Sequence, residues 1–311
     1  MEKKVLVFGS FVTDLCGRTS RLPGAGETVK GNFFKMGPGG KGSNQAVAAH
    51  RAGADVTFIT KLGDDSLGKE ALEFYEAEHM PTDMIFVDQE KATGAALIIV
   101  NEVTAQNQIV VIGGACEHFT DEDMPRILEK LEQSDVLLLQ LETNLEPVKQ
   151  LLKHAKKCGI LTILNPAPAH LLEIEYLQCV DIITPNETEA QCLTGVTVTD
   201  AESARKAARK LLEGGVGKVV ITMGGNGSYA CDGEQEMLVP IVKCGVLLDT
   251  TGAGDAFSGG LLAAIAKGYG FFEAVVYGSA VAGIAVTRQG TAPAMPYQAE
   301  IERVLDGLLV W

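Results

Sequence analysis

The chain has 311 residues, of which 46% are hydrophobic and 21% are charged, and its formal net charge is −14. This length and balance predict a globular protein with a substantial buried core. The negative charge, with no basic stripe to offset it, argues against a nucleic-acid partner and against binding to an anionic membrane surface. A site for an anionic ligand must therefore be local, built from backbone N–H groups and a few cations.

The seven cysteines are scattered along the chain and form no Cys-x-x-Cys pair. This pattern argues against a zinc site and against a disulfide framework, and it fits a reducing cytosol. The apolar run Val5–Phe8 is interrupted at Gly9, so it predicts a first buried strand rather than a signal peptide. No apolar stretch is long enough to span a bilayer. We therefore expect a cytoplasmic protein that binds no membrane.

In chain order, short apolar strands alternate with helical patterns, which implies parallel strands joined by right-handed crossovers in an α/β sandwich. Ligands of such sheets sit beyond the carboxyl ends of the strands. The expected strands are Val5–Phe8, Val56–Thr60, Val136–Gln140, Leu161–Asn165, Asp181–Thr184 and Lys218–Thr222. The expected helices are Ser43–Ala52, Ser66–His79, Thr120–Gln133, Leu145–Cys158, Ala201–Leu212 and Gln298–Leu309, with a capping box at Thr120 and Asp123 and an N-cap at Asp200.

Two stretches, residues 12–36 and 92–113, break this alternation and are typical of antiparallel strands inserted into the parallel scaffold. A small inserted sheet near an active site commonly acts as a lid. We therefore expect a single domain over residues 1–311, with a lid formed discontinuously by these two stretches. The exposed edges of the lid strands favour a homodimer that pairs through them.

Residues Asp249–Gly260 read Asp-Thr-Thr-Gly-Ala-Gly-Asp-Ala-Phe-Ser-Gly-Gly, directly before an apolar run with helical spacing. Gly252, Ala253 and Gly254 let backbone N–H groups converge at a helix N-terminus, where the helix dipole favours an anion. Asp255 beside this anion hole fits a base that takes the proton from a hydroxyl attacking a phosphate. The alternative is a strand-to-helix turn in which the aspartate is only a cap.

A second glycine cluster, at residues 37–46, also opens a helix. It is not a P-loop, because the lysine lacks the required spacing, and it is not a dinucleotide fingerprint. Gly39 and Gly40 permit close approach of the backbone to a ligand, while Lys41 and Asn44 supply donors that suit sugar hydroxyls. The alternative is a glycine-rich turn with a solvated lysine.

Taken together, these motifs resemble the ribokinase-like carbohydrate kinases (the phosphofructokinase-B family), in the same order along essentially the whole chain. The resemblance implies a three-layer α/β sandwich with a mostly parallel central sheet and a small inserted β-lid. The residues that carry it are Gly39–Asn44 with Gly53 and Gly63, then Thr93-Gly94, Gln140–Glu142, Asn165–Ala169, Asn186–Glu189, Thr222–Gly227 and Asp249–Gly260.

The resemblance also implies transfer of the γ-phosphate of ATP to O5 of a pentose, with Asp255 as general base and the N–H groups of Gly252, Ala253 and Gly254 around that phosphate. The residues that match the family's sugar-binding positions are Asp14, Gly40, Lys41, Asn44 and Glu142. The residues that match its nucleotide site are Asn186, Thr222, Gly224, Gly225, Asn226, Gly227, Gly254 and Ser279. From the residues alone, Thr222–Gly227 is equally a strand-to-strand turn.

Two metal ions are implied as well. Glu189, in the family's Asn-x-x-Glu motif, would hold Mg²⁺ largely through water, as suits an ion that keeps most of its waters. From the residues alone, Asn186 and Glu189 are equally a helix cap. The positions that match the family's K⁺ site are Asp249, Thr251, Ala285, Arg288, Gly290 and Ala294, and an alanine at the last removes one oxygen ligand.

Two departures bear on the sugar. Val12 stands where ribose-specific members usually carry an asparagine that reads a sugar hydroxyl, and an apolar side chain suits a substrate that lacks this hydroxyl. Cys116 also stands in place of an asparagine. We therefore expect ribose as the substrate, with 2-deoxyribose as the alternative and other sugars, sugar acids or nucleosides behind it. The intact Asp255 opposes a catalytically silent sugar sensor, and the missing dinucleotide fingerprint opposes an oxidoreductase.

Overall fold

The computed structural model describes residues 3–104 and 106–308, whose strands form a nine-stranded sheet and a separate four-stranded sheet. The larger sheet is parallel from β11 to β5 and antiparallel where β12 and β13 extend it, so the expected fold class is confirmed. In their order across the sheet the strands are β13 (Glu236–Val239), β12 (Ser228–Cys231), β11 (Lys218–Thr222), β10 (Ile182–Ile183), β9 (Leu161–Leu164), β8 (Val136–Leu139), β1 (Lys4–Phe8), β4 (Asp55–Gly63) and β5 (Ile85–Asp88).

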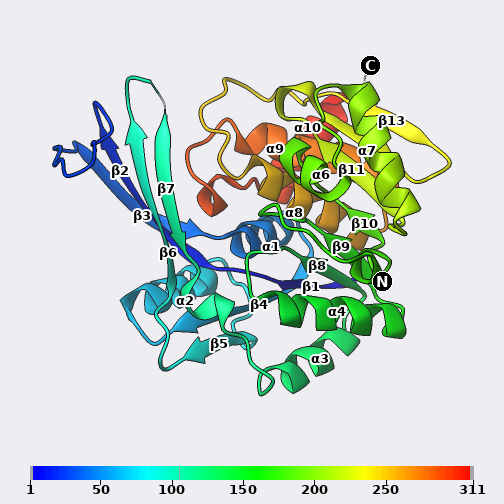
Figure 1. The fold of residues 1–311 in the computed structure, drawn as a ribbon, viewed down its shortest axis with the longest axis horizontal. Helices are drawn as coiled ribbons and strands as arrows, with labels where there is room; N and C mark the ends of the chain where they lie inside the picture. The colour runs from blue at the N-terminus through cyan, green and yellow to red at the C-terminus, as the bar shows by residue number, and fades with distance from the viewer. Residues whose placement is uncertain (1–2, 105, 309–311) are drawn as a thin grey trace.

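Helices cover both faces of this sheet and make three layers (Figure 1). Successive side chains of a strand point to opposite faces. In β1, Val5 and Val7 therefore belong to one hydrophobic cluster, and Leu6 and Phe8 to the other. The first cluster includes α1 (Lys41–Arg51), α2 (Ser66–Ala77), α8 (Ala253–Ala266), α9 (Phe271–Ala285) and α10 (Gln298–Leu308). The second includes α3 (Met124–Glu132), α4 (Leu145–Cys158), α5 (Ile174–Leu177), α6 (Glu187–Thr194) and α7 (Ala201–Glu213).

The four-stranded sheet projects from one side of this body (Figure 1, left). Its outer pairs are antiparallel, as expected, but its two central strands run parallel, which corrects the expectation of an antiparallel insert. The reason is that the chain enters these strands from β1 and β5, which are themselves parallel members of the main sheet. The strands, in order, are β3 (Phe33–Gly39), β2 (Val12–Thr19), β6 (Gly94–Asn101) and β7 (Asn107–Ile112).

Element boundaries follow the sequence closely, with one clear error. Asp200 is the N-cap of α7, as predicted, and accepts a hydrogen bond from the Ser203 N–H at 2.8 Å. The predicted capping box at Thr120 is wrong, because α3 begins only at Met124. The Asp123 carboxylate instead accepts from the Thr120 N–H and from the buried Lys61 ammonium, at 2.8 and 2.7 Å.

The sequence reasoning also missed the edge strands β5 and β13 and the helix α9, while Leu309, at the end of the last predicted helix, lies outside the described residues. Three 3₁₀ turns complete the chain: η1 (Gly114–Glu117), η2 (Gly224–Asn226) and η3 (Ala292–Ala294). Across the described part of the chain, every helix is too short or too polar to cross a membrane.

Candidate active site

The N-terminus of α8 lies beyond the carboxyl ends of the central strands and borders a cavity of about 180 Å³. Gly252 is its N-cap with φ of 76°, a left-handed conformation that favours glycine. Ala253, Gly254 and Asp255 follow in the first turn and line the same cavity. The predicted anion hole and the predicted base are therefore brought together at one helix end.

The Asp255 carboxylate is buried and held from the first turn of α1. Asn44 Nδ2 donates to Asp255 Oδ2 and Gln45 Nε2 donates to Asp255 Oδ1, both at 2.9 Å. Burial raises the pKa of Asp255, while the Lys41 ammonium and these two amide donors oppose the rise. The result is a desolvated carboxylate with a fixed orientation, as a general base requires.

Lys41 is the cation at the centre of a group of carboxylates. Asp255 contributes most to raising the pKa of the half-buried Lys41 ammonium, with further contributions from Glu142 and Glu189, although burial opposes this rise. Glu142 Oε2 in turn accepts from the Lys41 backbone N–H at 2.9 Å and from the Ser10 hydroxyl at 2.5 Å. The start of α1 is thereby tied to the ends of β1 and β8.

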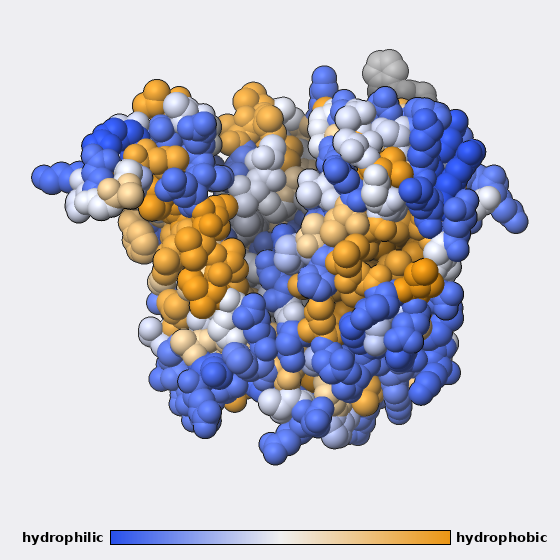
Figure 2. Space-filling view, viewed as in Figure 1, coloured by the Kyte–Doolittle hydropathy of each residue, from blue (hydrophilic) through white to orange (hydrophobic). Residues whose placement is uncertain are grey.

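A larger cleft of about 550 Å³ separates the small sheet from the loops at residues 247–251 and 289–293. Figure 2 shows the hollow between the two parts of the molecule. Asp14, on β2, lines this cleft, and burial raises the pKa of its carboxyl to about 6, although a hydrogen bond from Thr291 opposes the rise. A Cβ at Gly39 would lie 2.4 Å from Asp14 Oδ1, so the glycine makes room for this carboxylate.

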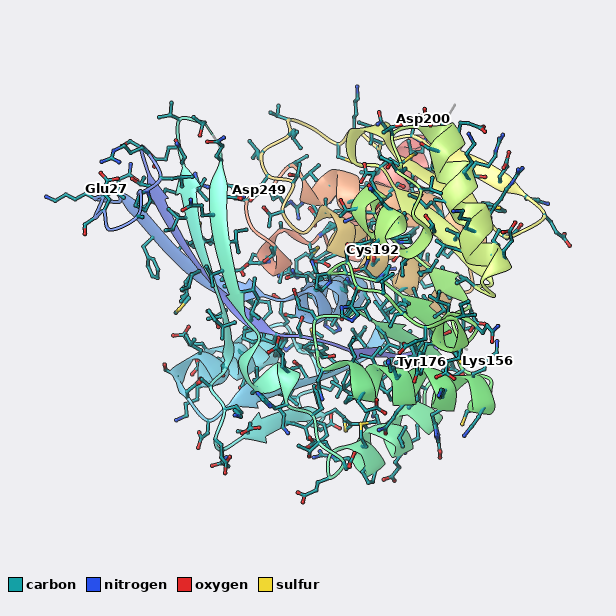
Figure 3. The ribbon with its side chains drawn as sticks, viewed as in Figure 1. Glu27, Lys156, Tyr176, Cys192, Asp200 and Asp249 are labelled. Atoms are coloured by element: carbon teal, nitrogen blue, oxygen red, sulfur yellow. The ribbon has the colours of Figure 1, made fainter. Side chains whose placement is uncertain are left out.

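The segment next to the anion hole is fastened by Asp249, which lies on the side of the body that faces the small sheet (Figure 3). Its two carboxylate oxygens accept from the Thr251 N–H at 2.9 Å and the Gly290 N–H at 3.1 Å. Burial favours a higher pKa for Asp249, but these hydrogen bonds hold it below its usual range.

The other three positions of the expected K⁺ site are Ala285, Arg288 and Ala294. They lie close in the chain to Gly290, which Asp249 binds. The Ala285 carbonyl accepts from the Arg288 N–H at 3.0 Å, the Arg288 guanidinium pairs with Glu300, and Ala294 belongs to η3. The oxygen-bearing groups at Asp249 and in the adjacent backbone fit a hard cation, whereas the Ala294 side chain offers no ligand.

Asn186 and Glu189 form the capping box of α6, so the structural reading of this motif is confirmed. The Asn186 N–H and Nδ2 donate to the two Glu189 oxygens at 2.9 Å each. Burial raises the pKa of Glu189, and both residues line the smaller cavity together with Lys41 and Thr222. Because each Glu189 oxygen keeps a free lone pair, the carboxylate fits a water-mediated Mg²⁺ contact.

The glycine-rich loop after β11 is a turn between antiparallel strands. Gly227 has φ of 83°, and a Cβ there would lie 2.1 Å from the Val239 carbonyl oxygen, so packing alone requires this glycine. Gly224, Gly225 and Asn226 are exposed beside Thr222 and line neither cavity.

Three further residues singled out in the sequence lie away from the cavity walls. Ser279 is buried within α9, where its hydroxyl donates to the Val275 carbonyl at 3.0 Å. Cys116 is buried and its thiol donates to the Gly113 carbonyl at 2.9 Å. Val12 is 4% exposed and packs between Gly39 and Gly94 on the face of β2 that carries Asp14.

The sequence reasoning missed several polar residues that position this site. Gln45 links Asp255 to Asn165 Oδ1, at 2.9 Å, and accepts from Gln140 Nε2 at 2.7 Å. Thr291 contacts Asp14 from the other side of the larger cleft. The available signal was a glutamine directly before the apolar run Ala46–Ala49 of α1, where a buried amide needs partners.

An α/β sandwich with a small sheet beside an acid at a helix N-terminus defines a phosphotransferase of small polar molecules. The chain matches the pfkB family of carbohydrate kinases over residues 2–298 and belongs to that family. It is 39% identical to the ribokinase of Haemophilus influenzae over 306 residues, which are 98% of this chain and 99% of that one. It is 38% identical to the deoxyribokinase of Salmonella typhi over 256 residues, 82% of this chain and 83% of that one.

Among solved structures, the ribokinase of Arabidopsis thaliana complexed with ribose and ATP superposes with a TM-score of 0.90. That similarity covers 98% of this chain and 99% of the other, at 30% identity. The expected resemblance and the expected class of enzyme, a sugar kinase, are thus confirmed.

Proposed function

We propose that the chain transfers the γ-phosphate of ATP to the 5-hydroxyl of D-ribose. The observation that carries this proposal is Asp255, buried at the N-terminus of α8 and oriented by the amides of Asn44 and Gln45. Ribokinases that are similar over nearly the whole chain support ribose as the sugar.

Asp255 takes the proton from the attacking hydroxyl, since burial raises the pKa of its carboxyl and so makes it a stronger base, while the Lys41 ammonium and the two amide donors favour its charged form. The backbone N–H groups of Gly252 and Gly254 stabilise the charge on the transferred group, as expected at a helix N-terminus. The Ala253 N–H, predicted to join them, donates to the Thr250 carbonyl at 3.1 Å and must leave it to reach a phosphate. Phosphoryl transfer needs positioning and charge stabilisation more than covalent help from the protein. These residues supply both.

The sugar is assigned to Asp14, Gly40, Lys41, Asn44 and Glu142. The carboxylates of Asp14 and Glu142 accept hydrogen bonds from sugar hydroxyls, and the Lys41 ammonium donates one. Asn44 Oδ1 is buried without a hydrogen-bond partner, so this amide retains an acceptor for a ligand hydroxyl. An unsatisfied buried acceptor costs about 1–3 kcal/mol, which a bound sugar would recover.

The nucleotide is assigned to Asn186, Thr222, Gly254 and the exposed turn at Gly224, Gly225, Asn226 and Gly227. Ser279 remains a member of this set by resemblance only, because its hydroxyl bonds within α9. Mg²⁺, which would neutralise charge on the phosphates, is assigned to Glu189 through water. K⁺ is assigned to the junction of Asp249, Thr251 and Gly290, with Ala285, Arg288 and Ala294 around it.

We also propose that the chain forms one domain in which the small sheet closes over the larger cleft and excludes water during transfer.

The face of the small sheet that points away from this cleft is apolar. On it Met36, Leu15, Leu97 and Val110 are paired across all four strands. Apolar side chains gather on this sheet in Figure 2. Such a patch is typical of an interface, and we assign it to a homodimer. Seven free thiols support a reducing, cytoplasmic location. The net charge of −14 disfavours nucleic acid and anionic membranes as partners.

Val12 favours a second candidate, 2-deoxy-D-ribose, because a buried valine cannot pair with a sugar hydroxyl. The deoxyribokinase similar to this chain adds weight to it. Other sugars, sugar acids and nucleosides, and a silent sugar sensor, rank below these two.

The deciding measurement is kcat/KM with ATP on D-ribose and 2-deoxy-D-ribose, side by side in potassium buffer. A preference for ribose supports the proposal, and a preference for deoxyribose replaces it with the second candidate. Activity on neither sugar overturns both.

A further inference from the structure

Three metal-ligating side chains meet between α3 and α4, outside the site described above. They are Glu132, His154 and Cys158, and one ligand atom from each lies within 4.8 Å of the other two. The kinase assignments use none of them. We propose that they form a binding site for a zinc ion.

The two helices present these ligands to a common point. His154 and Cys158 are four residues apart on α4, so their side chains share one face of the helix. Glu132 is the last residue of α3, and its Oε1 lies 2.8 Å from His154 Nε2. Tetrahedral zinc, with bonds of about 2.0–2.3 Å, places its ligand atoms about 3.5 Å apart. Zinc therefore replaces the His154–Glu132 hydrogen bond, which opens from 2.8 Å, while the wider separations, at most 4.8 Å, close by about 1 Å. Side chains at the surface can make both movements by small rotations.

The local charge favours a cation at this point. Both α3 and α4 end here, at Glu132 and Cys158, and helix C-termini carry partial negative charge. Two neighbouring lysines of α4 are engaged elsewhere, since Lys153 pairs with Glu175 at 3.3 Å and Lys156 lies 3.9 Å from Asp181. Lys157, which directly precedes Cys158, adds one positive charge near the cluster.

The ligand types select zinc over the Mg²⁺ that the kinase reaction uses. Imidazole and thiolate are ligands for borderline-soft ions, whereas Mg²⁺ takes oxygen ligands and retains water. Binding releases the Cys158 thiol proton, and three protein ligands leave a fourth position for water. The lack of a Cys-x-x-Cys pair does not oppose this site, because its ligands come from two helices.

The zinc site is remote from the phosphoryl-transfer site. α4 has 14 residues and so spans about 20 Å, from the carboxyl edge of the sheet, where the kinase residues lie, to the opposite edge, where Cys158 lies. Substitutions at the cluster should therefore leave sugar kinase activity unchanged.

The test is zinc titration by calorimetry of the reduced, chelator-stripped chain in excess Mg²⁺, with Co²⁺ absorption as a second readout. We expect one zinc ion per chain and a thiolate-to-cobalt charge-transfer band. Cys158→Ser should abolish this band, and Cys158→Ser and His154→Gln should each weaken zinc at least about tenfold, since even the loss of outer partners costs that much. Zinc should also raise the Tm of the unmodified chain and not that of these variants.

Two matched controls separate this site from adventitious thiol or imidazole binding. Cys192→Ser, on α6 (Figure 3), and His170→Gln, at an exposed position, should bind zinc as the unmodified chain does. Equal zinc affinity in Cys158→Ser and the unmodified chain, or a cobalt complex without a thiolate band, overturns the proposal. Equal losses in the control variants overturn it as well.

Discussion

The Thr291 hydroxyl lies 3.3 Å from Asp14 Oδ2, so a residue next to the anion hole touches the acid of the small sheet. The same hydroxyl donates to the Pro38 carbonyl on β3 at 3.0 Å. Thr291 also packs against Gly252, the N-cap of α8, since a Cβ at Gly252 would lie 3.4 Å from Thr291 Cα. One buried threonine therefore connects the proposed lid and the proposed phosphate site.

Thr291→Val should raise the KM for the sugar several-fold with a smaller effect on kcat. The substitution keeps the shape but removes the contacts of the hydroxyl with both Asp14 and the Pro38 carbonyl, each worth about 0.5–1.5 kcal/mol, and the contact with Asp14 is what opposes the raised pKa of the acid. Steady-state kinetics with varied sugar measures the effect. Thr287→Val is the control, because its hydroxyl bonds only to the Ile284 carbonyl, at 2.6 Å. Equal KM values for the two variants would show that Thr291 does not position Asp14.

Asp255→Asn should lower kcat by about 10²–10⁴ while ATP and sugar still bind, because the proton acceptor is lost. The new amide NH2 also faces Asn44 or Gln45, one of which must turn its own amide to accept from it. Calorimetric titration with each substrate measures binding, and a thermal scan verifies that the variant is folded. Turnover close to that of the unmodified chain would remove Asp255 from the role of general base.

The local signals in the sequence were enough for the scaffold and for placing Gly252 and Asp255 at one helix N-terminus, where the anion hole is proposed. Leu145–Cys158 was predicted to the residue because apolar spacing and the following Gly159 define that helix. Gly252 and Asp255 could be found because both belong to one short sequence motif, Asp249–Gly260. Gln45 and Thr291 were missed, since they meet Asp255 and Asp14 only through pairing across more than 200 residues.

Neither the direction of pairing in the small sheet nor the presence of helix α9 could be predicted from local sequence patterns. The parallel pairing of β2 with β6 depends on how β1 and β5 leave the main sheet. The helix α9 is apolar around most of its surface, so it shows little of the amphipathic pattern that identified the other helices.

Asp14→Asn should stabilise the sugar-free chain at pH 8 and have no effect on stability near pH 4. Burial raises the pKa of Asp14 from 3.8 to about 6, so the folded chain binds this proton more tightly than the unfolded chain. Stability is therefore lost as the pH rises through this interval, by at most about 3 kcal/mol and by about 1–2 kcal/mol after allowing for partial exposure. Thermal unfolding at both pH values measures it, with the exposed Asp83→Asn as control. A gain of the same size at pH 4 would show that the charge of Asp14 is not the cause.

Val12→Asn should shift the ratio of kcat/KM toward D-ribose and away from 2-deoxy-D-ribose. Val12 packs between Gly39 and Gly94, two residues before Asp14 on the same face of β2. Val12 is buried two residues from Asp14, which lines the larger cleft, and an asparagine of similar size there is expected to pair with the hydroxyl that distinguishes the two sugars. A site built to bind a hydroxyl rejects the analogue that lacks it, because its own polar group is then left unpaired. The measurement is competition between the two sugars, with Val12→Thr as a smaller polar control that should shift the ratio less. An unchanged ratio in Val12→Asn would mean that this position supports the strand without reading the sugar.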